Sequence, residues 1–291
     1  MTATIDAPDS RAAPKGVRRR REVIYRHTVL VRLTHWLNAL VIVVMIGSGL
    51  NIFNAHPRLY WGLKGDEYDR PWLSIAATQG AAGTRGVTTI GSWRFDTTGL
   101  LGVAKDKGQE IVKAWPSSLT IPSYQDLADA RHWHFLFAWV LAANGAVYLL
   151  WGLISRHLKR DIVPTVDDLK AIPRSVLDHV QLKHPVGEAA KRYNVLQRLA
   201  YLGVITLISL MVLTGLTMSP GFNAFAPWLL DLFGGRQSAR SIHFLCASGL
   251  VAFVAVHLIE VVLAGPINEI ASMITGRYAV PQDHAHDGVG Q

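Results

Sequence analysis

The sequence predicts an all-α integral membrane protein: a four-transmembrane-helix bundle with a folded periplasmic insertion between helices 1 and 2. Half of the 291 residues are hydrophobic and only 17% are charged, whereas a soluble domain has about 25% charged residues. Four long apolar stretches occur, and Lys and Arg gather on one side of them. The single cysteine, Cys246, excludes disulfides within the chain and Cys-ligated zinc or iron–sulfur sites.

The four stretches are long enough to cross a bilayer. A helix needs about 20 apolar residues to span roughly 30 Å of hydrocarbon, and each stretch reaches that length. We therefore expect transmembrane helices at about 29–53, 133–154, 196–218 and 241–264.

The flanking charges predict the orientation, because short cytoplasmic loops carry an excess of Lys and Arg. The N-terminal tail and the 155–194 segment are rich in both, whereas the 219–240 loop has only Arg236 and Arg240. We expect a multi-pass protein of a bacterial inner membrane with both termini in the cytoplasm. Residues 1–22 would form a disordered tail, residues 23–279 the helical domain and residues 280–291 a flexible tail.

The segment 54–130 between the first two helices is unusually long for a loop. It is too rich in aromatic residues for a disordered segment, and it contains several glycines. We expect a small folded periplasmic cap with short strands or turns. It could either shield the bundle or dock a partner.

Histidines inside the predicted spans are the main functional signal, because ionisable side chains in a membrane are costly and usually serve a function. His243 and His257 are 14 residues apart, which places them on the same side of one helix and about 21 Å apart along it. His134 lies at the depth of His243, and His35 at the depth of His257. Imidazole is an axial ligand of haem iron, so the pattern predicts two bis-histidine haems and electron transfer.

A weak internal repeat decides between His132 and His134, of which only one can face the bundle. Arg32-Leu33 precedes Gly49-Leu50 by the same seventeen residues that separate Arg198-Leu199 from Gly215-Leu216. Helices 1 and 2 thus resemble helices 3 and 4, and this register matches His134 with His243. The residues that match His35 and His257 are Tyr201 and Tyr148. We expect no haem there; packing or a quinone could fill the position.

These motifs resemble the bacterial di-haem cytochrome b561-type membrane subunits of formate dehydrogenases, nickel–iron hydrogenases and thiosulfate reductase-like enzymes. The resemblance rests on Arg32-Leu33-Thr34-His35-Trp36-Leu37-Asn38, on Arg131-His132-Trp133-His134-Phe135 and on the His243/His257 pair. It implies two haem b groups, one held by His35 and His257 on the cytoplasmic side and one by His134 and His243 on the periplasmic side.

Two further segments, Asn54–Gly62 and Leu119–Ser123, look most like the thiosulfate reductase-type branch. That resemblance implies a periplasmic molybdopterin oxidoreductase that docks on residues 54–130. The chain would pass electrons between this partner and the quinone pool of a respiratory chain, as a subunit of an oxidoreductase complex rather than an enzyme alone. A self-sufficient di-haem quinone oxidoreductase acting on a small molecule such as superoxide, a haem-free histidine-lined metal transporter, and a plain membrane anchor remain alternatives.

Four polar residues could serve a quinone or the haem propionates. Arg32 and Arg198 could pair with propionates or extend to lipid phosphates. Asn38 could orient His35 or a quinone, or could bond between helices. Glu260 could move protons or could be an interfacial charge at the end of its helix.

Overall fold

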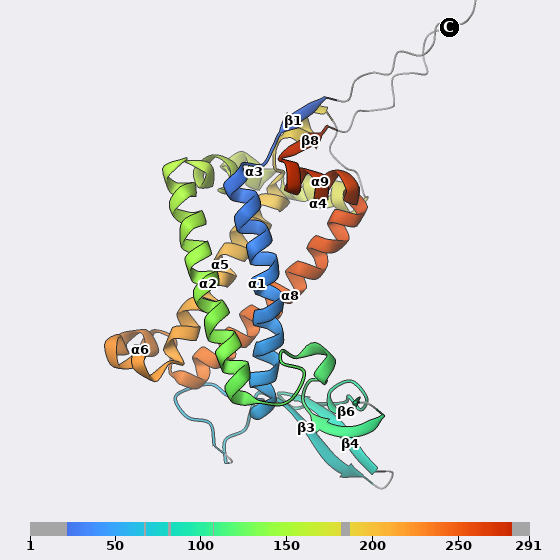
Figure 1. Ribbon diagram of the computed structural model, residues 1–291, viewed down its shortest axis with the longest axis vertical. Coiled ribbons are helices and arrows are strands. Elements are labelled where there is room, and N and C mark those ends of the chain that lie inside the picture. Colours follow the sequence, from blue (N-terminus) through green and yellow to red (C-terminus); the bar gives the residue numbers. More distant parts are fainter. Residues whose placement is uncertain (1–21, 67, 81–82, 107, 182–186, 281–291) are drawn as a thin grey trace, which may run out of the picture.

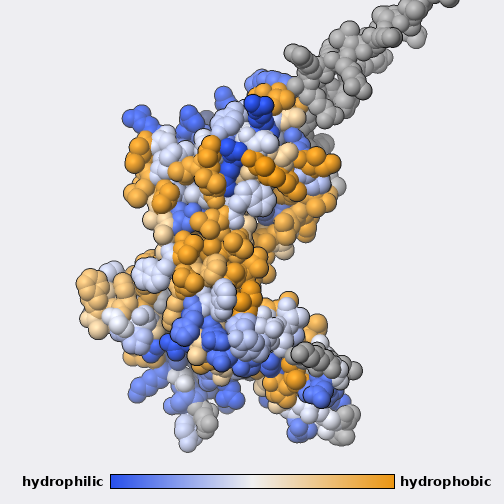
Figure 2. Space-filling model, in the orientation of Figure 1, coloured by the Kyte–Doolittle hydropathy of each residue, from blue (hydrophilic) through white to orange (hydrophobic). Residues whose placement is uncertain are grey.

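Four long helices form the centre of the protein. The structure is a computed structural model, and it describes residues 22–66, 68–80, 83–106, 108–181 and 187–280. The helices long and apolar enough to cross a membrane are α1 (Val29–Ala55), α2 (Leu127–Ile154), α5 (Val195–Thr217) and α8 (Arg236–Ala264). They run lengthwise through the molecule, and apolar side chains cover its middle (Figures 1 and 2). These helices confirm the prediction of a multi-pass membrane protein.

The four helices form two pairs. α1 packs along α2 and α5 along α8, while the two pairs touch each other at few points. Only 11–17% of the residues in the most apolar window of each helix are buried within the chain. Much of the helix surface therefore requires cover from lipid or from a non-protein group between the pairs.

Two of the four helices begin earlier than their apolar stretches. α2 begins at Leu127, where the Asp126 carboxylate accepts hydrogen bonds from the amides of Ala128 and Asp129 at 2.8 and 3.0 Å. α8 begins at Arg236. Both starts contain charged residues, Asp129 and Arg131 in α2 and Arg236 and Arg240 in α8, so hydropathy alone does not mark them. N-capping by a carboxylate satisfies amides that have no partner within the helix.

The chain is mostly helical rather than all-α, because the segment between α1 and α2 contains strands. One antiparallel sheet has the order β2-β3-β4-β5, and a second sheet pairs β6 with β7. Buried Leu73 and Ile75 alternate with less buried neighbours, as in a strand that covers a core on one face. The strand bounds are β2 (Arg58–Leu59), β3 (Leu73–Gly80), β4 (Gly83–Ile90), β5 (Trp93–Asp96), β6 (Gly102–Asp106) and β7 (Gln109–Lys113).

We call residues 56–126 the cap, and the end of the bundle beneath it the sheet end. The two sheets cross closely at Gly86, where a Cβ atom would lie 2.1 Å from the carbonyl oxygen of Leu101. A 3₁₀ turn, η1 (Ser117–Leu119), follows the strands. Two short helices, α6 (Pro220–Phe225) and α7 (Pro227–Leu232), join α5 to α8 at the same end of the bundle.

The cap is attached firmly to the bundle. The Asn51 amide on α1 donates to the carbonyls of Pro122 and Tyr124 at 2.8 and 2.9 Å. The Trp72 indole donates to Ser241 Oγ on α8 at 2.9 Å. Phe53 joins the buried core of the cap and stacks on Phe244 of α8, with ring centroids 5.0 Å apart. These contacts place the cap directly over one end of the helices.

The other end of the bundle, where α1 begins and α8 ends, is called the terminal end. There β1 (Val23–Tyr25) pairs with β8 (Arg277–Ala279), and the Val280 amide donates to the Glu22 carbonyl at 2.9 Å. Residues 1–21 and 281–291, which hold most of the two predicted tails, lie outside the described residues. Short elements complete this end: η2 (Leu158–Ile162), α3 (Val166–Lys170), α4 (Ile172–Val180), η3 (Gly187–Lys191) and α9 (Pro266–Thr275).

Candidate haem-binding centre

The structure brings the four predicted histidines together in two pairs. His35 of α1 faces His257 of α8 near the terminal end, with ring centroids 6.3 Å apart and ring planes at 64°. His134 of α2 faces His243 of α8 near the sheet end, with centroids 6.3 Å apart and planes at 60°. Each histidine pair therefore links α8 to one of the two neighbouring helices, α1 or α2.

The separation of 6.3 Å has a direct chemical meaning. A metal–imidazole bond is about 2.0 Å long and the bonding nitrogen lies about 1.1 Å from the ring centroid, so two rings on opposite sides of one iron have centroids about 6.2 Å apart. Both pairs therefore fit axial ligation of haem iron.

Hydroxyl groups hold the sheet-end pair in a defined tautomer. Ser48 Oγ donates to the Val44 carbonyl at 2.7 Å, so its oxygen accepts the Nδ1–H of His134 at 3.0 Å. Thr214 Oγ1 donates to the Leu210 carbonyl at 2.6 Å and accepts from His243 Nδ1 at 3.1 Å. Both arrangements leave Nε2 unprotonated for a metal, and such support is the usual second contact of a metal-binding histidine.

Glycines make room beside the same two rings. A Cβ atom at Gly49 would lie 3.4 Å from His134 Cε1, and one at Gly215 would lie 3.6 Å from His243 Cε1. Ser48 with Gly49 and Thr214 with Gly215 occupy equivalent places in the internal repeat. The sheet-end pair therefore has matched surroundings from both halves of the chain.

The terminal-end pair has different surroundings. His257 stacks on Phe253, with centroids 5.7 Å apart and planes at 9°, and His35 meets Trp36 edge-on at 5.3 Å. The buried Nδ1 of His35 has no hydrogen-bond partner among the described residues. Aromatic contacts rather than hydroxyls thus orient these rings, which leaves a less polar setting for a bound group.

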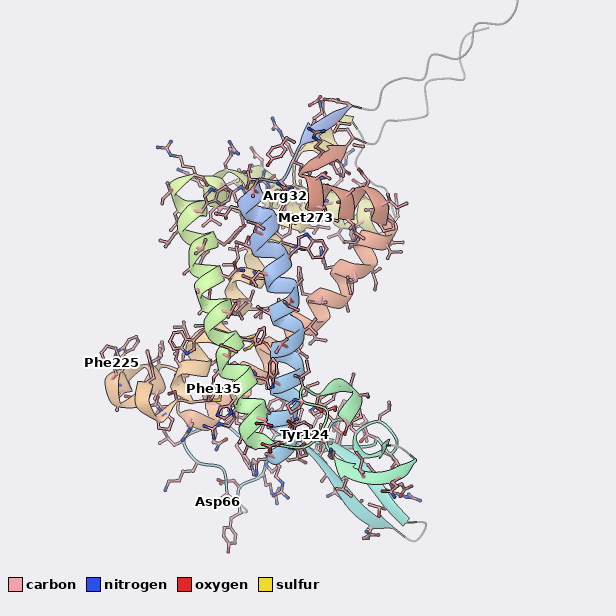
Figure 3. The ribbon with its side chains drawn as sticks, in the orientation of Figure 1. Arg32, Asp66, Tyr124, Phe135, Phe225 and Met273 are labelled. Atoms are coloured by element: carbon pink, nitrogen blue, oxygen red, sulfur yellow. The ribbon has the colours of Figure 1, made fainter. Side chains whose placement is uncertain are left out.

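Other predicted residues lie outside the two pairs. The His132 side chain is exposed and joins neither pair. The Arg32 guanidinium donates to the Ile274 carbonyl, and the Trp36 indole donates to the Met273 carbonyl at 3.0 Å. Arg32 and Met273 accordingly lie together at the terminal end (Figure 3).

The remaining polar candidates also have protein partners. Arg198 donates to the Val163 carbonyl at 3.2 Å and lies 3.5 Å from the Asp168 carboxylate. The Asn144 amide donates to Asn38 Oδ1 at 2.7 Å, which links α1 to α2. Glu260 lies 3.1 Å from His179 of α4. These contacts give each residue a structural role in the described chain.

Sequence reasoning missed the residues that contact the paired histidines. Ser48 and Thr214 look like ordinary polar residues in apolar helices, and Phe253 looks like core. Only the repeat register relates Ser48 to Thr214, each just before a matched glycine. Within the described ranges, no three His, Cys, Asp or Glu side chains are grouped to hold a metal ion.

A four-helix membrane bundle that pairs imidazoles at iron-binding distance defines a haem-containing membrane cytochrome. The profile of the family described as prokaryotic cytochrome b561 matches residues 26–276, and the chain belongs to this family. This membership implies binding of haem b and electron transfer.

The chain is also similar to YedZ1 of Azospira oryzae, described as a candidate protein-methionine-sulfoxide reductase subunit. The two are 29% identical over 243 residues, which cover 84% of this chain and 93% of that protein. No solved structure matches the chain.

Proposed function

We propose that the chain holds two haem b groups and carries electrons through the membrane between the quinone pool and a redox partner on the cap. His35 and His257 would hold one iron, and His134 and His243 the other. The observation that carries this proposal is the distance within each imidazole pair. The two ring centroids are 6.3 Å apart in both pairs, which lie near opposite ends of the bundle.

The protein side chains determine what each iron can do. With two imidazoles of the chain holding each iron, oxygen or a substrate would find no open position at the metal. Bound haem supplies one-electron chemistry. His243 and His257 lie about 21 Å apart along α8, and the two pairs divide the membrane crossing into shorter steps.

The partner would dock on the cap, which lies over the His134–His243 pair. The relative from Azospira oryzae is described as a subunit of a methionine-sulfoxide reductase. By analogy, the partner would be the catalytic subunit of such a reductase, with a molybdopterin cofactor, and electrons would flow from quinol to it. Exposed Trp93, Leu100 and Val112 on the cap offer apolar surface for the contact.

The distribution of Lys and Arg supports an orientation in the membrane. The terminal end would lie in the cytoplasm of a bacterium and the cap outside its inner membrane, because basic sequence precedes α1 and follows α2, and both of those helix ends lie at the terminal end. Quinol would then deliver its electrons first to the His35–His257 haem and then to the His134–His243 haem.

Stepwise reduction of the purified chain tests this order. A short-chain quinol should reduce both haems of the wild type. In His257→Ala or His35→Ala, the sheet-end haem should remain bound and should accept electrons from dithionite but only very slowly from quinol. Reduction of that haem by quinol at the wild-type rate in both variants would contradict the proposal.

A further inference from the structure

A cavity outside the two histidine pairs is large enough for a small molecule. It lies at the terminal end, has a volume of about 720 Å³, and is lined by the N-terminal segment, the end of α2, η2 and the start of α5. Trp151, His157 and Tyr193 form part of its wall. Ligand sites commonly have volumes of about 300–1,000 Å³ and combine aromatic walls with a few polar groups.

The cavity adjoins the tyrosine counterpart of the terminal-end histidine pair. The internal repeat matches His257 with Tyr148 and His35 with Tyr201. The Tyr148 ring lies 6.3 Å from that of His157, and the Tyr201 ring lies 5.2 Å from that of Tyr193. His35 and His257 are the proposed iron ligands. At the equivalent places in the repeat, Tyr201 and Tyr148 provide phenols close to the cavity wall.

His157 and Asp161 form a hydrogen-bonded pair on the cavity wall. The Nδ1–H of His157 donates to Asp161 Oδ2 at 2.8 Å, and Arg160 Nη2 donates to the same oxygen at 3.1 Å. The carboxylate fixes the tautomer of His157 and leaves Nε2 free to take up or release a proton. The imidazole packs against Trp151, with centroids 5.1 Å apart.

Most cations on the cavity wall already have protein partners. Lys191 lies 2.7 Å from Glu22 and 2.6 Å from Glu188. Arg26 lies over the rings of Tyr278 and Tyr193, at 4.4 and 5.4 Å from their centroids. Together with the contacts of Arg160 and Arg198 given above, this pairing favours a neutral, planar ligand with hydrogen-bonding oxygens over a phosphate.

The cavity also lies close to the terminal-end histidine pair. Buried His27 lines it, and the pKa of His27 is lowered to about 4 by burial and then by positive charge on Arg26, His35, Arg32 and His157. Val31 of α1 also lines the cavity, and it lies one helical turn before His35, a proposed iron ligand. A molecule in the cavity would be near the proposed electron path.

We propose that this cavity binds the head group of the quinone and that the His157–Asp161 pair exchanges protons with it. This inference rests on the proposed function. When quinol is oxidised, its two O–H bonds break and two C=O bonds form. The two electrons pass singly toward the His35–His257 pair. One proton goes to His157 Nε2 and the other to water. The neutral imidazole accepts its proton while Asp161 balances the charge gained.

Other groups that titrate or carry charge also surround His157. They are Arg160 and Asp161 from η2, Tyr148 from α2, Arg26 and His27 from the N-terminal segment, and Lys191, Arg192, Tyr193 and Arg198 from the segment leading into α5. Only His157 combines a free ring nitrogen with a carboxylate partner on this wall, which makes it the residue to test.

Quinol-driven haem reduction in His157→Gln and Asp161→Asn tests the assignment. Both variants should keep the haem content of the wild type, and His157→Gln should slow reduction by about 100-fold, as expected for loss of a general base. His179→Gln serves as a matched control, because His179 pairs with Glu260 outside the cavity.

Photolabelling gives a readout that does not depend on turnover. A short-chain azidoquinone should label peptides that contain Trp151 or Tyr193, and unlabelled quinone should compete. If quinol reduces the wild-type haems but the variants react at the wild-type rate, or the label falls only on other peptides, the cavity assignment is wrong and the proposed function stands. If quinol does not reduce the haem-loaded wild type at all, the proposed function fails, and this inference fails with it.

Discussion

At the scale of single residues, the hydroxyls behind the sheet-end imidazoles are the clearest test of ligand geometry. Ser48 and Thr214 accept Nδ1–H from His134 and His243 at 3.0 and 3.1 Å. Such a bond holds the ring in the orientation that a metal requires and makes the opposite nitrogen a better donor. The two hydroxyls should therefore govern how tightly the sheet-end haem is held.

We predict that Ser48→Ala and Thr214→Val each weaken retention of one haem by about 10-fold, because loss of such a contact costs about 10–100-fold in metal affinity. The transfer rate of haem from the purified chain to an excess of apomyoglobin measures this. Ser209→Ala is the control, since that exposed hydroxyl donates only within α5, to the Ile205 carbonyl at 2.8 Å. Equal haem loss from all three variants would contradict the assigned role.

At the residue scale, the sequence predicted the four histidines that the structure brings together in pairs, but not the hydroxyls beside them. Histidine is rare in membrane spans, and the 14-residue spacing on α8 limits the geometry, so His35, His134, His243 and His257 stand out. Serine and threonine carry no such signal, because their hydroxyls commonly bond to the preceding helical turn. Only the fold shows that Ser48 and Thr214 also reach an imidazole.

At the scale of elements, one polar contact fixes the first helix pair. The Asn144 amide of α2 donates to Asn38 Oδ1 and to the Thr34 carbonyl of α1, at 2.7 and 2.9 Å. The residue is buried in an apolar setting, where hydrogen bonds between helices replace those to water. This contact joins the helices that carry His35 and His134.

We predict that Asn144→Ala lowers the free energy of unfolding by about 1–2 kcal/mol, the range measured for hydrogen bonds between membrane helices. Thermal unfolding in detergent with haem bound, followed by circular dichroism, measures the loss. Thr206→Ala is a suitable control, because that exposed hydroxyl bonds only to the Leu202 carbonyl of its own helix. Equal midpoints for the wild type and Asn144→Ala would show that the contact adds nothing.

The elements at the terminal end should respond to acid. The amides of Arg26 and His27 donate to the Gly276 carbonyl, which ties the start of α1 to the end of α9. Burial, followed by nearby positive charge, lowers the pKa of His27 from 6.5 to about 4. The unfolded chain then binds more protons than the folded chain over this interval, so stability falls as pH falls from about 6.5 to about 4.

We predict that His27→Gln reduces this loss of stability. Unfolding midpoints measured between pH 7 and pH 4 should fall less steeply in the variant than in the wild type. Thr206→Ala should keep the wild-type slope, because that exposed hydroxyl carries no charge and bonds only within its own helix. A wild-type slope in His27→Gln would mean that other groups cause the acid sensitivity.

The ends of the helices show where a prediction from hydropathy succeeds and where it fails. Hydropathy located the start of a span within a few residues where the helix begins in apolar sequence, as at Val29 and Val195. It missed the starts of α2 and α8, which contain charged residues. The start of α2 depends on capping by Asp126, and the start of α8 on the Gly62 carbonyl of the cap, which accepts from the amides of Gln237 and Ser238. The strands of the cap were expected only as short strands or turns, because their pairing joins residues far apart in the chain.

At the scale of the whole molecule, the proposed orientation separates the two ends of the bundle. The cap should face outward and the terminal end the cytoplasm. A cysteine replacing Ser92, in the β4–β5 turn, should react with a membrane-impermeant maleimide on intact cells in a Cys246→Ser background. A cysteine replacing exposed Arg174 of α4 should react only after the membrane is opened. The opposite pattern would invert the topology and place the quinone chemistry on the outer side.

The proposed electron path requires two irons, each held between two imidazoles. The most direct measurement is electron paramagnetic resonance of the oxidised chain together with its haem-to-protein ratio. We predict two haems per chain and two low-spin six-coordinate signals, one absent in His35→Ala and the other in His134→Ala. A single haem in the wild type, or loss of the same signal in both variants, would contradict the proposal that each of the two histidine pairs holds its own haem.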